Sequence, residues 1–156
     1  MDEKFMLFLN DIPAQNQEFV IELDKKLVNK GCKREIKSAK SGFVTSYLNP
    51  LSGKTLLNYV FRKTGVKMRI YAAEIRKYDA TLHEFPLSMK KEIIKATDCK
   101  KLTGGTCSPT CPGGYVFSMD EVEYKKCKNT AFFFDLNEIS STYIEKMLDA
   151  ELGVEN

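Results

Sequence analysis

The side chains best suited to chemistry in this chain are four cysteines that fall within a window of 29 residues. Cys99, Cys107, Cys111 and Cys127 follow the spacing Cys-x7-Cys-x3-Cys-x15-Cys. Four thiolates can hold a tetrahedral zinc ion, and structural zinc sites are usually built on tight turns. The glycines and prolines between residues 104 and 114 supply such turns. The pattern therefore predicts a structural zinc site with these four cysteines as ligands.

The same spacing leaves other states of these thiols open. In an oxidising compartment, the four cysteines would form two disulfides, with three connectivities to choose from. In a reducing compartment they can also stay free and unliganded. Neither short gap matches the common Cys-x2-Cys knuckle of zinc sites. A redox pair of Cys107 and Cys111 is a further hypothesis, although Cys-x3-Cys is not the spacing of thioredoxin-like sites.

A second candidate site comes from the uneven charge of the chain. The net charge is only +3, but residues 25–77 hold fourteen basic and two acidic residues, whereas residues 1–24 and 129–156 each carry a net charge of −5. A basic middle segment indicates either a surface that faces an anion or charge matching within the molecule.

The basic segment has the alternation of a β-hairpin. Strand-forming residues run over 56–61 and 66–71 around Thr64-Gly65, and a two-residue turn there would pair Phe61 with Met68. Because side chains alternate between the two faces of a strand, one face is apolar and the other is polar or basic. The apolar face holds Leu57, Tyr59, Phe61, Val66, Met68 and Ile70, and the other holds Asn58, Val60, Arg62, Lys67, Arg69 and Tyr71.

Arg62, Lys67, Arg69 and Tyr71 are the predicted anion-binding residues, because they combine phosphate-seeking charge with one ring for stacking. Sheets that bind single strands usually expose more aromatic residues than this one. The alternative is a solvated face, partly neutralised by the acidic C-terminal helix.

The remaining periodicity predicts the elements that position these residues. Apolar residues at helical spacing favour helices over 12–31, 86–97 and 141–152. Strands are expected at 42–48, 115–119, 122–126 and 131–134, the last too apolar for an exposed position. The prediction is a single α+β domain over residues 1–156, in which about three helices pack on an antiparallel sheet made of a three-stranded meander, a second hairpin and a further strand.

No catalytic signature is found in the sequence. Ser52-Gly53-Lys54-Thr55 resembles the end of a P-loop, but Leu48 replaces the required glycine and a strand pattern follows. His83 is the only histidine and lies in an expected loop. We also expect no membrane-spanning segment and a cytoplasmic location, because no apolar run is long enough and no secretory signal is visible.

These observations lead to a functional hypothesis with two alternatives. The first is a non-enzymatic binding or regulatory module with a structural zinc loop, whose basic sheet face meets an anionic partner such as nucleic acid. The second is a protein-interaction domain that uses the cysteine loop and the acidic C-terminal helix. The third is a thiol-dependent redox protein that uses Cys107 and Cys111.

Overall fold

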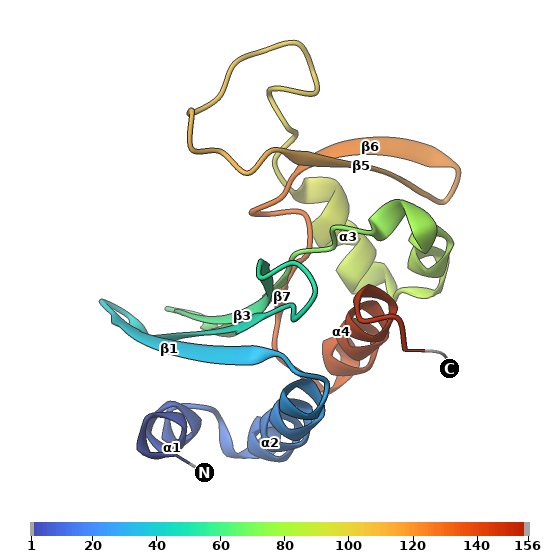
Figure 1. The fold of residues 1–156 in the computed structure, drawn as a ribbon. Helices are drawn as coiled ribbons and strands as arrows, with labels where there is room; N and C mark the ends of the chain where they lie inside the picture. The colour runs from blue at the N-terminus through green and yellow to red at the C-terminus, as the bar shows by residue number, and fades with distance from the viewer. Residues whose placement is uncertain (1, 155–156) are drawn as a thin grey trace.

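The computed structural model describes residues 2–154 and has the α+β architecture expected from the sequence (Figure 1). Its helices are α1 Glu3–Asn10, α2 Ala14–Asn29, α3 Leu87–Lys95 and α4 Glu138–Glu151, with two short 3-10 helices, η1 Ile75–Lys77 and η2 Asp79–Glu84. Its strands are β1 Lys33–Ala39, β2 Gly42–Leu48, β3 Thr55–Arg62, β4 Gly65–Ile70, β5 Gly114–Met119, β6 Val122–Cys127 and β7 Phe133–Asp135.

The larger sheet is antiparallel, with the strand order β1-β2-β3-β4-β7. The first four strands are consecutive in the chain and form a meander, so the predicted three-stranded meander has one more strand, β1, at its edge. The strand β7 returns from the far end of the chain and pairs with β4, with Arg69 opposite Phe133 and Lys67 opposite Asp135. This return brings the C-terminal third of the chain onto the sheet.

The register of the β3–β4 hairpin differs from the prediction by two residues. The turn consists of Lys63 and Thr64, so Phe61 pairs with Val66 and Arg62 with Gly65. Gly65 has φ +132°, a conformation that favours glycine over other residues. A shift of two residues keeps every side chain on its predicted face, because the side-chain period of a strand is two. The separation into an apolar and a basic face is therefore confirmed.

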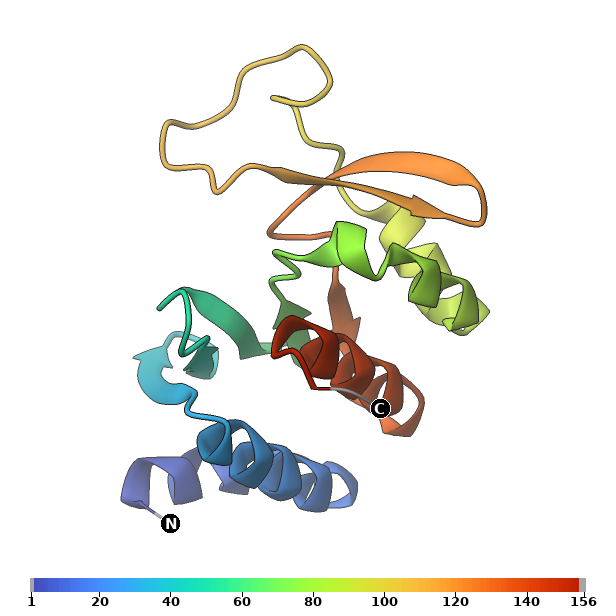
Figure 2. The same cartoon turned by 45° about the vertical axis from the view of Figure 1, so that its right-hand side comes forward.

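Helices α1, α2 and α4 lie together on one side of this sheet in both views (Figures 1 and 2). The apolar face of the hairpin points toward them, and the Phe8 ring of α1 lies 5.4 Å from the Tyr59 ring and 6.0 Å from the Phe61 ring. Tyr59, Leu57, Met68 and Ile70 are fully buried in this layer. Burial of these side chains is the main force that holds the helices on the sheet.

The helix ends are set by local capping. Helix α4 begins at Glu138, three residues earlier than predicted, because Asn137 accepts a hydrogen bond from the Ser140 amide at 2.9 Å and Ser140 Oγ accepts one from the Asn137 amide at 3.2 Å. The sequence prediction did not include α1, whose Asp2 side chain caps the Phe5 amide at 2.8 Å. None of the helices in residues 2–154 is long and apolar enough to cross a membrane.

The smaller sheet is the hairpin β5–β6, which packs against η1 and η2 and is bonded to α3 through Lys126 and Asp120, above the main sheet (Figure 1). Its turn residues Asp120 and Glu121 have φ +51° and +68°, as a two-residue hairpin of this type requires. Asp120 also pairs with His83 at 2.8 Å and with Lys90 at 3.0 Å. These contacts fix the hairpin tip to η2 and α3, and they give His83 a structural role.

Candidate functional site

Three of the four predicted anion-binding residues gather around one aromatic ring on the outer face of the main sheet. The guanidinium carbon of Arg69 lies 4.6 Å from the centroid of the Phe133 ring, Lys67 Nζ lies 5.1 Å from it, and the guanidinium carbon of Arg62 lies 5.6 Å from it. Cations at these distances are attracted by the quadrupole of the ring. Strands β3, β4 and β7 thus build one cluster that combines positive charge with an aromatic surface.

The hydrogen bonds of this cluster orient its cations without cancelling their charge. Arg69 donates to the Asn129 carbonyl at 2.8 Å and to Asn58 Oδ1 at 3.3 Å, and both acceptors are neutral. Tyr71 donates its hydroxyl proton to Asn129 Oδ1 at 3.3 Å. The one carboxylate in the cluster is Asp135, which lies 3.4 Å from Lys67 Nζ. Arg62, Lys67, Arg69, Tyr71 and Phe133 are called the basic sheet face below.

No helix among residues 2–154 covers the basic sheet face, because α1, α2 and α4 lie on the opposite side of the sheet (Figures 1 and 2). The acidic C-terminal helix therefore does not neutralise it. Asp149 of this helix instead contacts Lys26 of α2 at 2.6 Å. Arg62 is exposed and Lys67, Arg69, Tyr71 and Phe133 are partly exposed, so the face presents an excess of positive charge to solvent.

Phe133 is the residue of this face that the sequence prediction missed. The run 131–134 was expected to be buried throughout, and Ala131, Phe132 and Phe134 are indeed almost fully buried. Phe133 is only half-buried and shares the outer face with Lys67 and Arg69. The signal available in the sequence was the period of two, which places Phe132 and Phe134 on one side of the strand and Phe133 on the other.

The four cysteines of the predicted zinc site do not come together. Among residues 2–154 there is no group of three or more histidine, cysteine, aspartate or glutamate side chains that could hold a metal ion. Cys99 is buried beside β6, where its amide donates to the Lys125 carbonyl at 2.9 Å, and Cys107 is exposed in the long loop that extends away from the rest of the chain (Figure 1). A zinc site with these four ligands is therefore not supported, because backbone pairing with β6 holds Cys99 at the base of the loop.

Cys111 has an environment that favours its thiolate. The Gly113 amide donates to Cys111 Sγ at 3.4 Å, and this bond lowers the pKa of the Cys111 thiol. The neighbouring Cys107 thiol, Lys101 and Lys128 lower it further. The cysteines are all free, so Cys107 and Cys111 form a dithiol at the end of an exposed loop.

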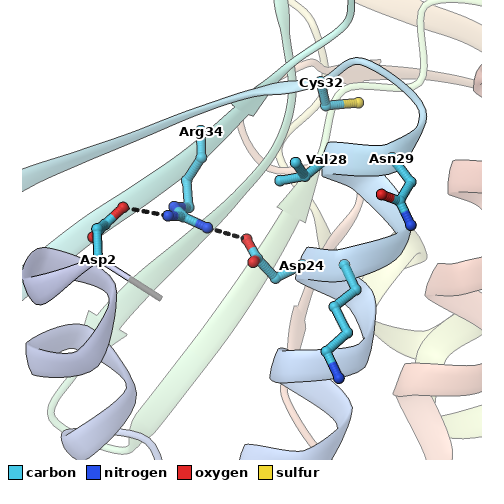
Figure 3. Close-up of a pocket in the computed structure, with 7 residues that line it drawn as sticks. Asp2, Asp24, Val28, Asn29, Cys32 and Arg34 are labelled. Carbon is cyan, nitrogen blue, oxygen red and sulfur yellow. Dashed lines mark hydrogen bonds and ion pairs between the residues drawn. The ribbon is translucent and has the colours of Figure 1, made fainter.

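A hollow of about 500 Å³ lies beside α2 (Figure 3). Residues that line it form a structural ion pair, so we do not regard it as a ligand site. Arg34 donates from one nitrogen to Asp24 at 2.7 Å and from the other to Asp2. Tyr47 also donates to Asp24, at 2.7 Å. Because both terminal nitrogens of the Arg34 guanidinium already bind carboxylates, Arg34 cannot bind a further anion with two parallel hydrogen bonds. Cys32 lies at the edge of the hollow with its sulfur turned away from the pair.

Comparisons of the chain with protein-family models, with curated proteins and with solved structures found no match. The fold and the site define an α+β protein with an uncovered, basic and aromatic sheet face.

Proposed function

We propose that this chain is a non-enzymatic module that binds single-stranded nucleic acid on its basic sheet face. The observation that supports the proposal is the placement of Arg62, Lys67 and Arg69 around the Phe133 ring. Sheets that bind single strands use cations for the phosphates and aromatic rings for the bases. Strands in a sheet lie about 4.8 Å apart, so a face built on three of them can follow a nucleic acid backbone for a few nucleotides.

The open side of the sheet favours a single strand over a folded protein partner. Stable protein interfaces have an apolar centre that is depleted of charge, whereas the centre of this face carries three cations and one carboxylate. Nucleic acid supplies a phosphate for each cation and a flat base for the ring. Binding of this kind releases counterions and therefore weakens steeply as salt increases.

The test is fluorescence anisotropy with a labelled oligothymidylate of about 16 nucleotides, titrated with protein between about 50 and about 200 mM salt. We expect the double variant Arg62→Gln/Lys67→Gln to bind at least about tenfold more weakly. The slope of log affinity against log salt becomes less steep by roughly 1.4, because each lost phosphate contact contributes about 0.7 for a single strand. Phe133→Leu should weaken binding by about 1–3 kcal/mol and leave the slope unchanged.

Lys4→Gln/Lys91→Gln is the matched control, since it removes the same charge from exposed positions on α1 and α3. We expect this variant to keep the affinity and the salt slope of the wild type. A wild-type protein that binds no oligonucleotide at low salt would contradict the proposal. A stable homodimer without affinity for polyanions would instead favour the protein-interaction hypothesis.

A second candidate function, thiol exchange at Cys107 and Cys111, is favoured by the Gly113 amide that contacts Cys111 Sγ. In such a reaction the Cys111 thiolate attacks a low-molecular-weight disulfide and Cys107 resolves the mixed disulfide, so that one disulfide forms in the loop and two small thiols are released. We expect the alkylation rate of Cys111 to rise with pH around a midpoint below the ordinary value of about 8.5.

Mass spectrometry of alkylated peptides at several pH values gives the rate for each cysteine separately. The same titration in denaturant supplies the reference, because the Gly113 contact is lost in the unfolded chain. In Cys107→Ala the midpoint of Cys111 should move up, since the neighbouring thiol no longer stabilises the thiolate. Equal midpoints for Cys111 in the native and the denatured chain would exclude this candidate.

A further inference from the structure

A cleft of about 600 Å³ lies where the main sheet meets the smaller one. Its walls come from the start of β3, from the residue after β4, from the end of the cysteine loop and from β5. The residues used below are Lys54, Leu56, Tyr71, Pro112, Tyr115 and Lys128. Volumes of this size are typical of sites for small molecules. We call this space the Tyr115 cleft.

Two lysines line the cleft, and neither has an acidic partner in the described part of the chain. Lys54 is exposed and Lys128 is half-buried, and among residues 2–154 no carboxylate lies within 4.0 Å of either ammonium group. The backbone of Lys54 is held by its turn, since its carbonyl accepts from the Asn49 amide at 2.8 Å and its amide donates to Ser52 Oγ at 3.2 Å. Uncompensated ammonium groups at a cleft are suited to phosphate.

The remaining walls combine two tyrosine rings and apolar side chains with the polar residues Asn49, Ser52 and Thr55. The Tyr115 hydroxyl accepts a hydrogen bond from the Ala72 amide at 2.9 Å, which fixes the position of its ring, and Leu56 beside it is almost fully buried. Lys128 Nζ lies 5.6 Å from the centroid of the Tyr115 ring. With Tyr71 at its edge, the cleft can hold a flat heteroaromatic ring beside a phosphate.

Two glutamates also line the cleft, and their carboxylates are already engaged. Glu151 accepts from the Tyr78 hydroxyl at 2.6 Å and from the Glu74 amide at 3.0 Å, and the Glu74 carboxylate lies 3.0 Å from Lys77. Burial raises the pKa of Glu151, while its hydrogen bonds with Tyr78 and the Glu74 amide act in the opposite direction. The glutamates therefore oppose a bound anion less than two free carboxylates would.

The cleft continues the basic sheet face through one residue. Tyr71 belongs to both, and Asn129 joins them because it accepts from the Tyr71 hydroxyl at 3.3 Å and from Arg69 Nε at 2.8 Å. Asn129 directly follows Lys128 in the chain. A nucleic acid strand that lies along Arg62, Lys67 and Arg69 would thus place its terminal nucleotide near the cleft.

We propose that the Tyr115 cleft binds a nucleotide that carries a phosphate monoester, with Lys54 and Lys128 on the phosphate and the partly exposed Tyr71 against the base. This nucleotide is either a free mononucleotide or the phosphorylated end of a strand, and the second case rests on the function proposed above. A monoester carries more negative charge than the diester inside a strand, so two unpaired lysines discriminate between an end and the interior.

The experiment compares oligothymidylates of one length that carry a 5′-phosphate, a 3′-phosphate or hydroxyl groups at both ends. We expect one of the two phosphates to tighten binding by roughly tenfold, the effect of about one charge-assisted contact. The variant Lys54→Gln/Lys128→Gln should lose this preference and keep its affinity for the unphosphorylated strand within about twofold. Lys4→Gln/Lys91→Gln should keep the preference. Unchanged thermal unfolding of both variants shows that they are folded.

Calorimetric titration with thymidine 5′-monophosphate alone separates this inference from the proposed function. Binding of the mononucleotide that Lys54→Gln/Lys128→Gln abolishes supports the cleft even when no strand binds. Strand binding without preference for a phosphorylated end, together with no mononucleotide binding, overturns the cleft and leaves the proposed function standing. Failure of both the strands and the mononucleotide to bind overturns both.

Discussion

Gly114→Ala is expected to lower the free energy of unfolding by about 3 kcal/mol, although it adds only one methyl group. A Cβ at this position would lie 2.5 Å from Cys99 Cβ, 2.6 Å from Cys99 Sγ and 2.9 Å from Leu102 Cδ1. Cys99 cannot retreat easily, because it is buried and its amide is bonded to the Lys125 carbonyl at 2.9 Å. The strain should therefore be transmitted to the pairing between the loop base and β6.

Urea denaturation of the wild type and the variant measures this effect. Gly105→Ala is the control, since the nearest atom to its Cβ would be the Lys100 carbonyl oxygen, at 3.3 Å, and the loss of backbone freedom in the unfolded chain is the same. We expect that control to change stability by less than about 1 kcal/mol. Equal destabilisation by the two alanines would contradict the steric explanation.

A double-mutant cycle assigns the clash to its partner. Cys99→Gly removes both atoms nearest to the new Cβ, so Gly114→Ala should cost much less in the Cys99→Gly background than in the wild type. This coupling also concerns the candidate site, because Gly114 lies between Pro112 and Tyr115, two residues that line the Tyr115 cleft. The cysteine loop is thus positioned at its base by close packing of Cys99 on Gly114.

The role of Cys99 illustrates what the sequence could and could not predict. The side-chain periods of strands and helices are local properties of the sequence. They were sufficient to predict β2 to β6 and α2 to α4 to within a few residues. The cysteine spacing has no such local meaning, because a loop of glycines and prolines can bring thiols together or hold them apart. The backbone pairing of Asp98 with Lys126 and the packing of Cys99 on Gly114 together decide where Cys99 lies.

The elements missed in the sequence have identifiable reasons. In β1 the charged residues Lys33, Arg34, Glu35 and Lys37 hide the strand pattern, and charge of this kind is usual on an edge strand. Arg34 even points toward the helices, since one of its partners, Asp2, caps α1 and the other, Asp24, lies in α2. Such an arrangement depends on contacts between separate elements, which no local pattern encodes.

In the candidate site, too, the local pattern was predictable from the sequence and the contacts between distant elements were not. The alternation in β3 and β4 was sufficient to put Arg62, Lys67 and Arg69 on one face, even with the register wrong by two residues. The return of β7, which adds Phe133, is a pairing between residues more than 60 positions apart and could not be read from the hairpin. The Tyr115 cleft was likewise not predictable, since Lys54 and Lys128 are brought together only by the whole fold.

Lys126→Met is the second substitution for which we expect a large effect, a loss of about 3 kcal/mol in the free energy of unfolding. Lys126 is buried, and its ammonium group donates to the Ile94 carbonyl at 2.8 Å, to the Ala96 carbonyl at 2.9 Å and to Asp98 at 2.8 Å. Two of these acceptors lie at the C-terminal end of α3, where carbonyls lack partners within the helix. A positive charge there is also favoured by the helix dipole.

Methionine keeps most of the side-chain length of Lys126 but donates no hydrogen bond, so all three acceptors would lose their partner while the packing is largely retained. Lys125→Met is the matched control, because Lys125 is the exposed neighbour on the opposite face of β6, and it should change stability by less than about 0.5 kcal/mol. Urea denaturation compares the two variants, and amide hydrogen exchange should show faster exchange in α3 for Lys126→Met alone. Similar stabilities for Lys126→Met and the wild type would mean that the ammonium group does not hold α3 against the smaller sheet.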